Sequence, residues 1–216
     1  MKMNKTTNIN QIMNLLGKQY KTAKISLNYS NPVQLLAAVM LSAQCTDVRV
    51  NIVTKELFKK YKTARDFANA DIKQLEKDVK STGFYRSKAG NIKKTCTIIV
   101  DKLKGKVPDK MEELVALPGV GRKTANIVLS NAYGVNVGIA VDTHVKRLSG
   151  RLGFTKNIMP EKIEKNLMEL VPKKDWNYIT YLLIEHGRAV CKAPTPICSK
   201  CILYSLCPRN GVSKYK

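Results

Sequence analysis

A short turn that contains two glycines separates two helix-forming stretches near the middle of this chain. It reads Leu-Pro-Gly-Val-Gly over residues 117–121. Pro118 ends the first stretch, because a proline cannot continue a helix without the loss of a backbone hydrogen bond. Gly119 and Gly121 permit backbone angles that other residues resist, and Val120 can turn toward a core. The pattern predicts a helix-hairpin-helix, although an ordinary turn between two helices also often contains glycine.

The charge of the chain favours the more specific of these two interpretations. Its 38 Lys and Arg residues against 16 Asp and Glu residues give a formal net charge of +22. Such an excess predicts a polyanionic partner, because each neutralised phosphate releases condensed counterions; the alternative is a surface of solvated lysines. The amides of a hairpin and the N-terminus of the next helix can hold a phosphate. We therefore expect DNA to be bound by Gly119, Val120, Gly121 and Arg122.

Lys123 stands in the first turn of the second helix, where the positive end of the helix dipole favours a neutral, nucleophilic amine. Such an amine can attack the anomeric carbon of a deoxyribose and expel the base, which leaves a Schiff base. Asp142 follows 19 residues later, in Val-Asp-Thr-His-Val over 141–145. Its carboxylate can stabilise positive charge on the sugar or assist proton transfer. The alternatives are a phosphate contact for Lys123 and a helix N-cap for Asp142.

Helical spacing dominates the rest of the chain, and no stretch alternates for long as a strand does. Ile163, Leu167 and Leu170 repeat at i, i+4 and i+7. Asp109 follows a proline and is expected to cap a short helix over 110–117 that runs into the hairpin. Helices are therefore expected over most of the chain.

The protein is expected inside the cell and away from membranes. Its longest fully apolar run, residues 35–41, is far shorter than the about 20 residues that span a bilayer. The N-terminus leads into an amphipathic pattern rather than a signal-peptide core. For a bacterial protein this location means the cytoplasm or the nucleoid.

Four of the six cysteines form a compact set near the C-terminus, with the spacing C-x6-C-x2-C-x5-C. In an intracellular protein such clustering favours the ligation of a metal or a cluster over disulfides. Four thiolates suit either zinc or a [4Fe–4S] cluster, and the spacing does not decide between them. The other two, Cys45 and Cys96, lie in apolar helical contexts and are expected in the core. The expected ligands are Cys191, Cys198, Cys201 and Cys207.

Together these motifs resemble the endonuclease III family of DNA glycosylases over nearly the whole chain. The resemblance implies an all-α protein of two domains, namely a six-helix barrel with the hairpin at 28–135 and a second domain formed by 1–27 and 136–216. It favours a [4Fe–4S] cluster over zinc, in a structural or DNA-binding role. The resemblance is carried by Leu-Ser-Ala-Gln at 41–44, Gly-Phe-Tyr-Arg-Ser-Lys-Ala at 83–89, the hairpin at 117–125, the segment 141–145, His-Gly-Arg at 186–188 and the four cysteines.

By this resemblance Lys123 matches the Schiff-base nucleophile and Asp142 the catalytic aspartate of the family. A lysine at that position is typical of bifunctional enzymes, which remove a base and then nick the abasic strand by β-elimination. Gln44 matches a polar residue that fills the gap left by a flipped nucleotide. Phe84 matches an apolar wedge opposite that gap, where leucine is often found, and core packing is the alternative.

The sequence therefore predicts a monomeric, bifunctional DNA glycosylase and abasic-site lyase of base excision repair. Its expected substrate is duplex DNA with oxidised pyrimidines or abasic sites, and its expected cofactor is a [4Fe–4S] cluster. Two alternatives stay open. One is a glycosylase for another lesion or mismatch, since these motifs do not describe the base pocket. The other is a non-catalytic DNA-binding module that keeps the hairpin and the cluster.

Overall fold

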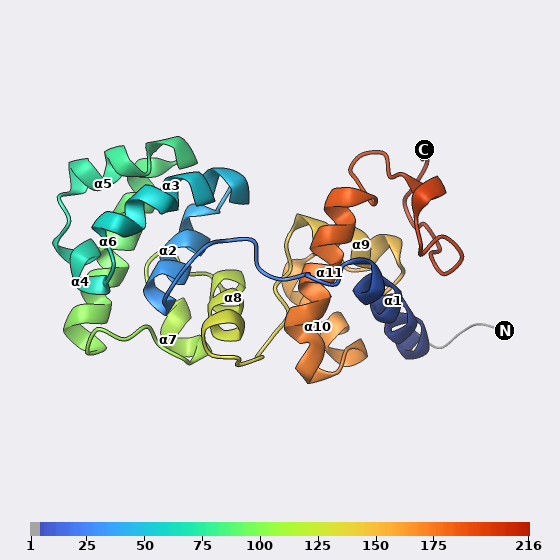
Figure 1. Cartoon of the computed structure of the whole chain (residues 1–216). Helices are drawn as coiled ribbons and strands as arrows, with labels where there is room; N and C mark the ends of the chain where they lie inside the picture. The colour runs from blue at the N-terminus through green and yellow to red at the C-terminus, as the bar shows by residue number, and fades with distance from the viewer. Residues whose placement is uncertain (1–4) are drawn as a thin grey trace. The chain divides into compact units, whose positions relative to one another are not determined.

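The computed structural model describes residues 5–216, in which helices are joined by turns and irregular segments without any β-strand (Figure 1). The predicted all-α class is thereby confirmed. Residues 1–4, the start of the segment in which no signal peptide is expected, lie outside the described part of the chain. Among the described residues, no helix is long and apolar enough to cross a membrane.

The chain divides into two compact units. One is Ser26–Val137, which we call the hairpin unit. The other joins the N-terminal segment up to Ile25 with Gly138–Lys216, and we call it the cysteine unit. Each has a hydrophobic core of its own. The sequence-based boundaries at 28 and 135 differ from these by two residues at each end.

The hairpin unit is built around its first helix. Its elements are α2 (Pro32–Leu41), α3 (Asp47–Lys60), α4 (Ala64–Asn69), α5 (Ile72–Asp78), the 3-10 turn η1 (Lys80–Thr82), α6 (Tyr85–Lys102), α7 (Met111–Val115) and α8 (Arg122–Ala132). Helix α2 packs against α3, α6 and α8, and α6 packs against α4 and α5. Residues 33–41 of α2 are all buried. An apolar surface on every side is what a helix needs when other helices surround it.

Polar side chains start these helices at the positions that the local sequence dictates. Asn31 caps α2, since its side chain accepts a hydrogen bond from the amide of Gln34 at 2.9 Å, and Pro32 occupies the first helical position. Thr63 and Asp66 form a reciprocal capping box at the start of α4. Each of these contacts satisfies an amide that the helix itself leaves without an acceptor.

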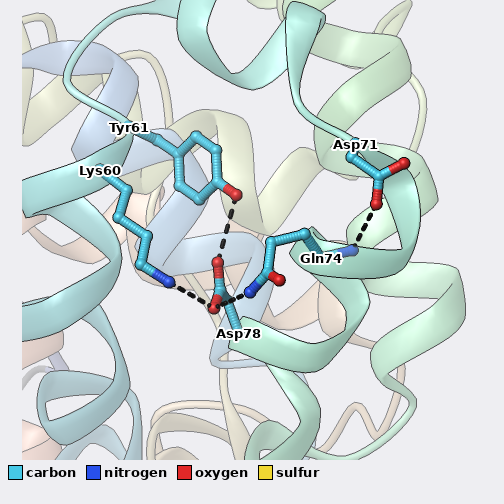
Figure 2. A network of polar contacts seen from close by, with 5 residues as sticks. All are labelled: Lys60, Tyr61, Asp71, Gln74 and Asp78. Atoms are coloured by element: carbon cyan, nitrogen blue, oxygen red, sulfur yellow. Dashed lines mark hydrogen bonds and ion pairs between the residues drawn. The ribbon is translucent and has the colours of Figure 1, made fainter.

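A network of polar side chains joins the end of α3 to α5 (Figure 2). Asp78 accepts three hydrogen bonds, which come from Lys60 Nζ (2.8 Å), Gln74 Nε2 (2.9 Å) and Tyr61 Oη (3.2 Å). Burial alone would raise the pKa of Asp78, but the three donors outweigh burial and the pKa is lowered. Burial and the neighbouring Asp78 carboxylate raise the pKa of Tyr61 to about 12. Asp71 caps α5 by accepting from the amide of Gln74 at 2.8 Å.

The cysteine unit combines the N-terminal helix with the helices of the C-terminal part. Its elements are α1 (Lys5–Gln19), α9 (Thr143–Arg151), α10 (Pro160–Leu170), the turn η2 (Lys173–Asp175), α11 (Trp176–Ala189) and the turn η3 (Cys198–Lys200). Helix α11 packs against α9 and α1, and α10 packs against both of those helices as well. Ile163 and Leu167 are buried in this core and Leu170 packs against it, so the apolar repeat predicted for α10 is confirmed.

Candidate nucleic-acid interface and cysteine cluster

The predicted hairpin lies between α7 and α8 and is fastened to α6. The amide of Val120 donates to the carbonyl of Leu117 at 3.1 Å, which closes the turn. The Val120 side chain is buried, as expected. Thr95 of α6 donates through Oγ1 to the carbonyl of Pro118 at 2.8 Å. The hairpin is therefore held by the core of the unit rather than by its own residues alone.

The two glycines of the hairpin meet different requirements. Gly119 has a φ of +75°, which favours glycine, and a Cβ there would lie 2.8 Å from Nδ2 of Asn91. Gly121 has a φ of −88° and a ψ of 171°, an extended conformation that any residue adopts. The backbone freedom expected of both glycines is therefore used at Gly119 but not at Gly121. A Cβ at Gly121 would meet no atom within 4 Å, so its lack of a side chain keeps the start of α8 open.

The first helix of the hairpin is shorter than predicted. Helix α7 spans Met111–Val115 rather than 110–117, and Asp109 does not cap it. The backbone is extended at Lys110, with φ −119° and ψ 142°, so the N-cap position falls one residue beyond Asp109. The residues after Val115 form the turn instead of a last helical turn, because the hairpin bends there.

Helix α8 begins immediately after the hairpin, with Arg122 as its first residue and Lys123 as its second. Both side chains are exposed. No side chain caps this helix, and uncapped amides at the N-terminus of a helix are groups that bind an anion. The structure thus places Lys123 beside the N-terminus of a helix, where the sequence predicts it.

Gln44 and Phe84, the residues expected to enter the DNA, share an unusual backbone conformation. Their φ angles are 53° and 48°, in the left-handed region that residues other than glycine seldom adopt. Both are exposed, Phe84 to 68%. Core packing of Phe84 is therefore excluded. Strained residues of this kind concentrate at functional sites.

Asp142 is the N-cap of α9, as one of the two interpretations of the sequence predicts. Its Oδ1 accepts a hydrogen bond from the amide of Val145 at 2.8 Å, and the side chain is half-buried. Among the described residues, its Oδ2 has no hydrogen-bond partner. Asp142 belongs to the cysteine unit and Lys123 to the hairpin unit, so their action as a catalytic pair stays a prediction.

The four C-terminal cysteines line one small cavity of the cysteine unit, together with Arg151 and His186. Arg151 Nη1 donates toward the sulfur of Cys191 at 3.4 Å, and Nε2 of His186 lies 3.4 Å from the sulfur of Cys201. Across residues 5–216, no group of three or more His, Cys, Asp or Glu side chains could hold a metal ion as it stands. The structure therefore brings the four predicted ligands to a common cavity without identifying what they bind.

The thiol pKa is raised for several of the cysteines. Burial, together with the neighbouring cysteine sulfurs, raises the pKa of Cys198, Cys201 and Cys207. Cys96 lies in the core as predicted, and burial raises its pKa to about 12. Cys45 is only half-buried, so its predicted core position is not fully realised.

Two arginines of α9 hold the loop that follows the first cysteine, and neither is among the residues predicted from the sequence. Arg147 Nε donates to the carbonyl of Cys191 at 3.1 Å. Arg151 donates to the carbonyls of Lys192 at 2.8 Å and Pro194 at 3.1 Å. The available signal was their i, i+4 spacing, which puts both on one face of a helix.

Comparison with known proteins identifies the family. A family model described as HhH-GPD superfamily base excision DNA repair protein matches residues 37–173. Endonuclease III of Synechocystis sp. is 52% identical over 203 residues, which are 94% of this chain and 93% of that protein. The chain belongs to the endonuclease III family. Endonuclease III of Bacillus subtilis is 49% identical over 214 residues and covers 97% of this chain and 96% of its own length.

A solved structure described as a trapped endonuclease III–DNA covalent intermediate has the same fold. It is 46% identical to this chain, covers 96% of it and 97% of its own length, and superimposes with a TM-score of 0.91. The predicted family and the predicted class of enzyme, a base excision repair enzyme, are confirmed. The family model spans Gln44, Phe84, Lys123 and Asp142 but ends before the four cysteines. The similarity to endonuclease III from Bacillus subtilis extends over nearly the whole chain.

Proposed function

We propose that this member of the endonuclease III family is a bifunctional DNA glycosylase and abasic-site lyase that removes oxidised pyrimidines from duplex DNA. The observation that carries the proposal is the position of Lys123, an exposed amine in the first turn of α8 directly after the hairpin. The covalent intermediate described for a 46% identical relative supports chemistry of this kind.

Lys123 performs the covalent step. Its amine attacks C1′ of the damaged nucleotide, and the bond between C1′ and the base breaks as the base leaves with the electron pair and takes up a proton. The attacking amine gives up a proton, and its nitrogen lone pair then breaks the bond between C1′ and the ring oxygen. That oxygen takes up a proton, and the Schiff base results. Removal of a proton from C2′ expels the 3′ phosphate and cuts the strand, and water finally releases the lysine. Asp142 stabilises the positive charge that develops on the sugar while the base leaves.

The hairpin anchors the DNA strand by its backbone. The amides at Gly121 and at the start of α8 bind a phosphate, because they stand at the positive end of a helix that no side chain caps. Arg122 adds a positive charge at the same end. Gln44 fills the gap left by the flipped nucleotide and Phe84 wedges the opposite side. Both are exposed, Gln44 between α2 and α3 and Phe84 between η1 and α6.

The cysteine cavity binds a [4Fe–4S] cluster, with Cys191, Cys198, Cys201 and Cys207 as its ligands. The donor set fits this group, because four thiols line one cavity. Burial and the neighbouring sulfurs disfavour the thiolates of Cys201 and Cys207, and bound iron would offset this effect. Arg151 adds a hydrogen bond to the Cys191 sulfur. When bound, the cluster would tie the C-terminal loop to the segment at the end of α11, where Cys191 lies, and would take no part in the reaction at the sugar.

Borohydride reduction in the presence of abasic-site duplex DNA tests the proposed enzyme. We expect a covalent protein–DNA adduct with the wild-type chain and its loss in Lys123→Gln. The control is Lys55→Gln, which removes another exposed lysine, from α3. Absence of an adduct with the wild-type chain would leave the non-catalytic DNA-binding module, and an undiminished adduct in Lys123→Gln would assign the nucleophile elsewhere.

A panel of duplexes with defined lesions tests the substrate class. We expect release of oxidised pyrimidines such as thymine glycol and 5-hydroxycytosine, accompanied by strand cleavage. Release confined to an alkylated purine or to a mismatched base would overturn the assignment of oxidised pyrimidines. It would leave the lysine chemistry in place.

A further inference from the structure

Lys88 is a buried lysine of α6 whose ammonium group joins two segments that lie far apart in the sequence. Only 6% of the residue is exposed. Its Nζ donates to the carbonyl of Leu41 at 2.8 Å and to the carbonyl of Thr82 at 2.7 Å. Leu41 is the last residue of α2, and Thr82 is the last residue of η1. One side chain thus fixes the ends of two helical elements to a third.

Both carbonyls lie just before an exposed residue with a left-handed backbone. Gln44 follows Leu41 by three residues, and Phe84 follows Thr82 by two. The chain between each carbonyl and its exposed residue is short, so a shift of the carbonyl is transmitted to the residue. Lys88 is therefore connected to the two side chains that the proposed function inserts into DNA.

The buried charge of Lys88 is not explained by a gain in the stability of the protein. Burial lowers the pKa of Lys88, and among the described residues no carboxylate forms an ion pair with its ammonium group. A methionine would fill similar space without a charge to desolvate. It would, however, leave the carbonyls of Leu41 and Thr82 without this donor at the negative ends of their helices. The benefit of a lysine at this position is that it holds the carbonyls of Leu41 and Thr82 in place.

We propose that Lys88 is a positioning residue that sets the separation between Gln44 and Phe84, so that both enter the DNA together when a nucleotide leaves the stack. The inference rests on the proposed function. Lys88 itself touches neither the sugar nor the base, and it acts through the two carbonyls. Its effect should therefore appear where a base must be flipped out of a duplex and not where the substrate is already unstacked.

The test compares two reactions of the full-length protein. The first is single-turnover release of thymine glycol from a duplex, which requires flipping. The second is borohydride trapping on a single-stranded abasic oligonucleotide, which has no opposite strand and leaves no gap to fill. We expect Lys88→Met to lower the rate of the first reaction relative to the second by about tenfold, the scale of one lost hydrogen-bonded contact.

Lys93→Met is the matched control. Lys93 lies on the same helix, is half-buried, and also donates through Nζ to a backbone carbonyl, that of Ala70 at the end of α4. We expect it to lower thermal stability to a similar degree and to leave the ratio of the two reactions within twofold of wild type. Equal ratios in Lys88→Met and Lys93→Met would reduce Lys88 to a structural residue and overturn the inference.

A double-mutant cycle gives a second test. If Lys88 acts through Gln44 and Phe84, then Lys88→Met should lower the ratio by less than twofold in a Gln44→Ala/Phe84→Ala background. A full tenfold loss in that background would overturn the inference. Should Lys88→Met fail to fold, Lys88→Gln takes its place, because its shorter amide cannot serve both carbonyls, and an unchanged ratio there would also reject the role. A wild-type protein that neither releases the base nor forms an adduct would instead refute the proposed function.

Discussion

Asn91 of α6 lies against the bare Cα of Gly119, where an added Cβ would approach its Nδ2 to 2.8 Å. The contact fixes the hairpin on α6 and excludes a side chain at Gly119 on two grounds, the lack of space and the φ of +75°. Gly121, two residues later, has neither restriction. The two glycines of one motif therefore meet different demands. Gly119 is needed for folding, and Gly121 leaves space for a ligand.

Alanine substitutions separate these demands. Gly119→Ala should lower the free energy of unfolding by about 2 kcal/mol, because the new Cβ both strains the backbone and displaces Asn91. Gly121→Ala should change that free energy by less than about 1 kcal/mol, since the extended backbone accepts alanine. It should nevertheless weaken the binding of abasic-site duplex by about tenfold, the equivalent of roughly 1.4 kcal/mol, because the methyl group obstructs the approach of a phosphate.

Urea unfolding and fluorescence anisotropy with labelled duplex measure the two quantities. Gly119→Ala is expected to lose binding only in proportion to the fraction of the protein that is unfolded. Unimpaired binding by Gly121→Ala would contradict the role of this hairpin in holding a phosphate.

Asp142→Asn distinguishes the capping role of Asp142 from its proposed catalytic role. Asparagine caps a helix about as well as aspartate, so the bond to the amide of Val145 and the thermal stability should both survive. The neutral amide cannot stabilise positive charge on the sugar, and single-turnover base release should fall by about a hundredfold or more. Asp142→Ser provides the control, since serine caps the helix without a charge. A rate of base release in Asp142→Asn equal to that of wild type would show that the residue is only a cap.

Local sequence predicted the parts of the site that depend on neighbours along the chain. Lys123 in the first turn of a helix and Asp142 as a possible N-cap follow from residues within one turn of each. The spacing of the four cysteines likewise predicted their common location. What local sequence could not give depends on contacts between distant segments. Lys88 donates to a carbonyl 47 residues away, and no periodicity records such a bond.

The same limit explains where the structure departs from local expectation. Asp109 has the right residue type for a cap, but the backbone turns into α7 one residue later because the hairpin sets the end of that helix. Gly121 has the residue type of a left-handed turn and an extended backbone instead. In each case the tertiary setting overrides the preference of the single residue.

Substitution of one cysteine ligand should remove iron and also disorder the C-terminal loop. Anaerobically purified protein should contain about four iron and four sulfide per chain, as a [4Fe–4S] cluster requires. Cys198→Ser should lower the iron content and increase proteolysis after residue 190, while the hairpin unit keeps its helical signal. If the wild-type protein instead contains stoichiometric zinc, the assignment of a cluster is wrong and the four cysteines form a zinc site.

The network in Figure 2 predicts a dependence of stability on alkaline pH. Tyr61 donates to Asp78 in the folded protein, and its pKa is raised from 10.0 to about 12 by burial and by that carboxylate. Because the folded-state pKa lies above the unfolded one, the stabilisation by Tyr61 is complete below pH 10 and is lost as the pH rises toward 12. Tyr61→Phe should therefore lower the free energy of unfolding by about 1 kcal/mol at pH 8, and the difference from wild type should shrink between pH 10 and pH 12.

The control is an Asp78→Asn background, in which the acceptor loses its charge. Tyr61→Phe should have a smaller effect there at pH 8. Urea unfolding across this range measures each quantity, and a difference between Tyr61→Phe and wild type that stays constant up to pH 12 would contradict the raised pKa.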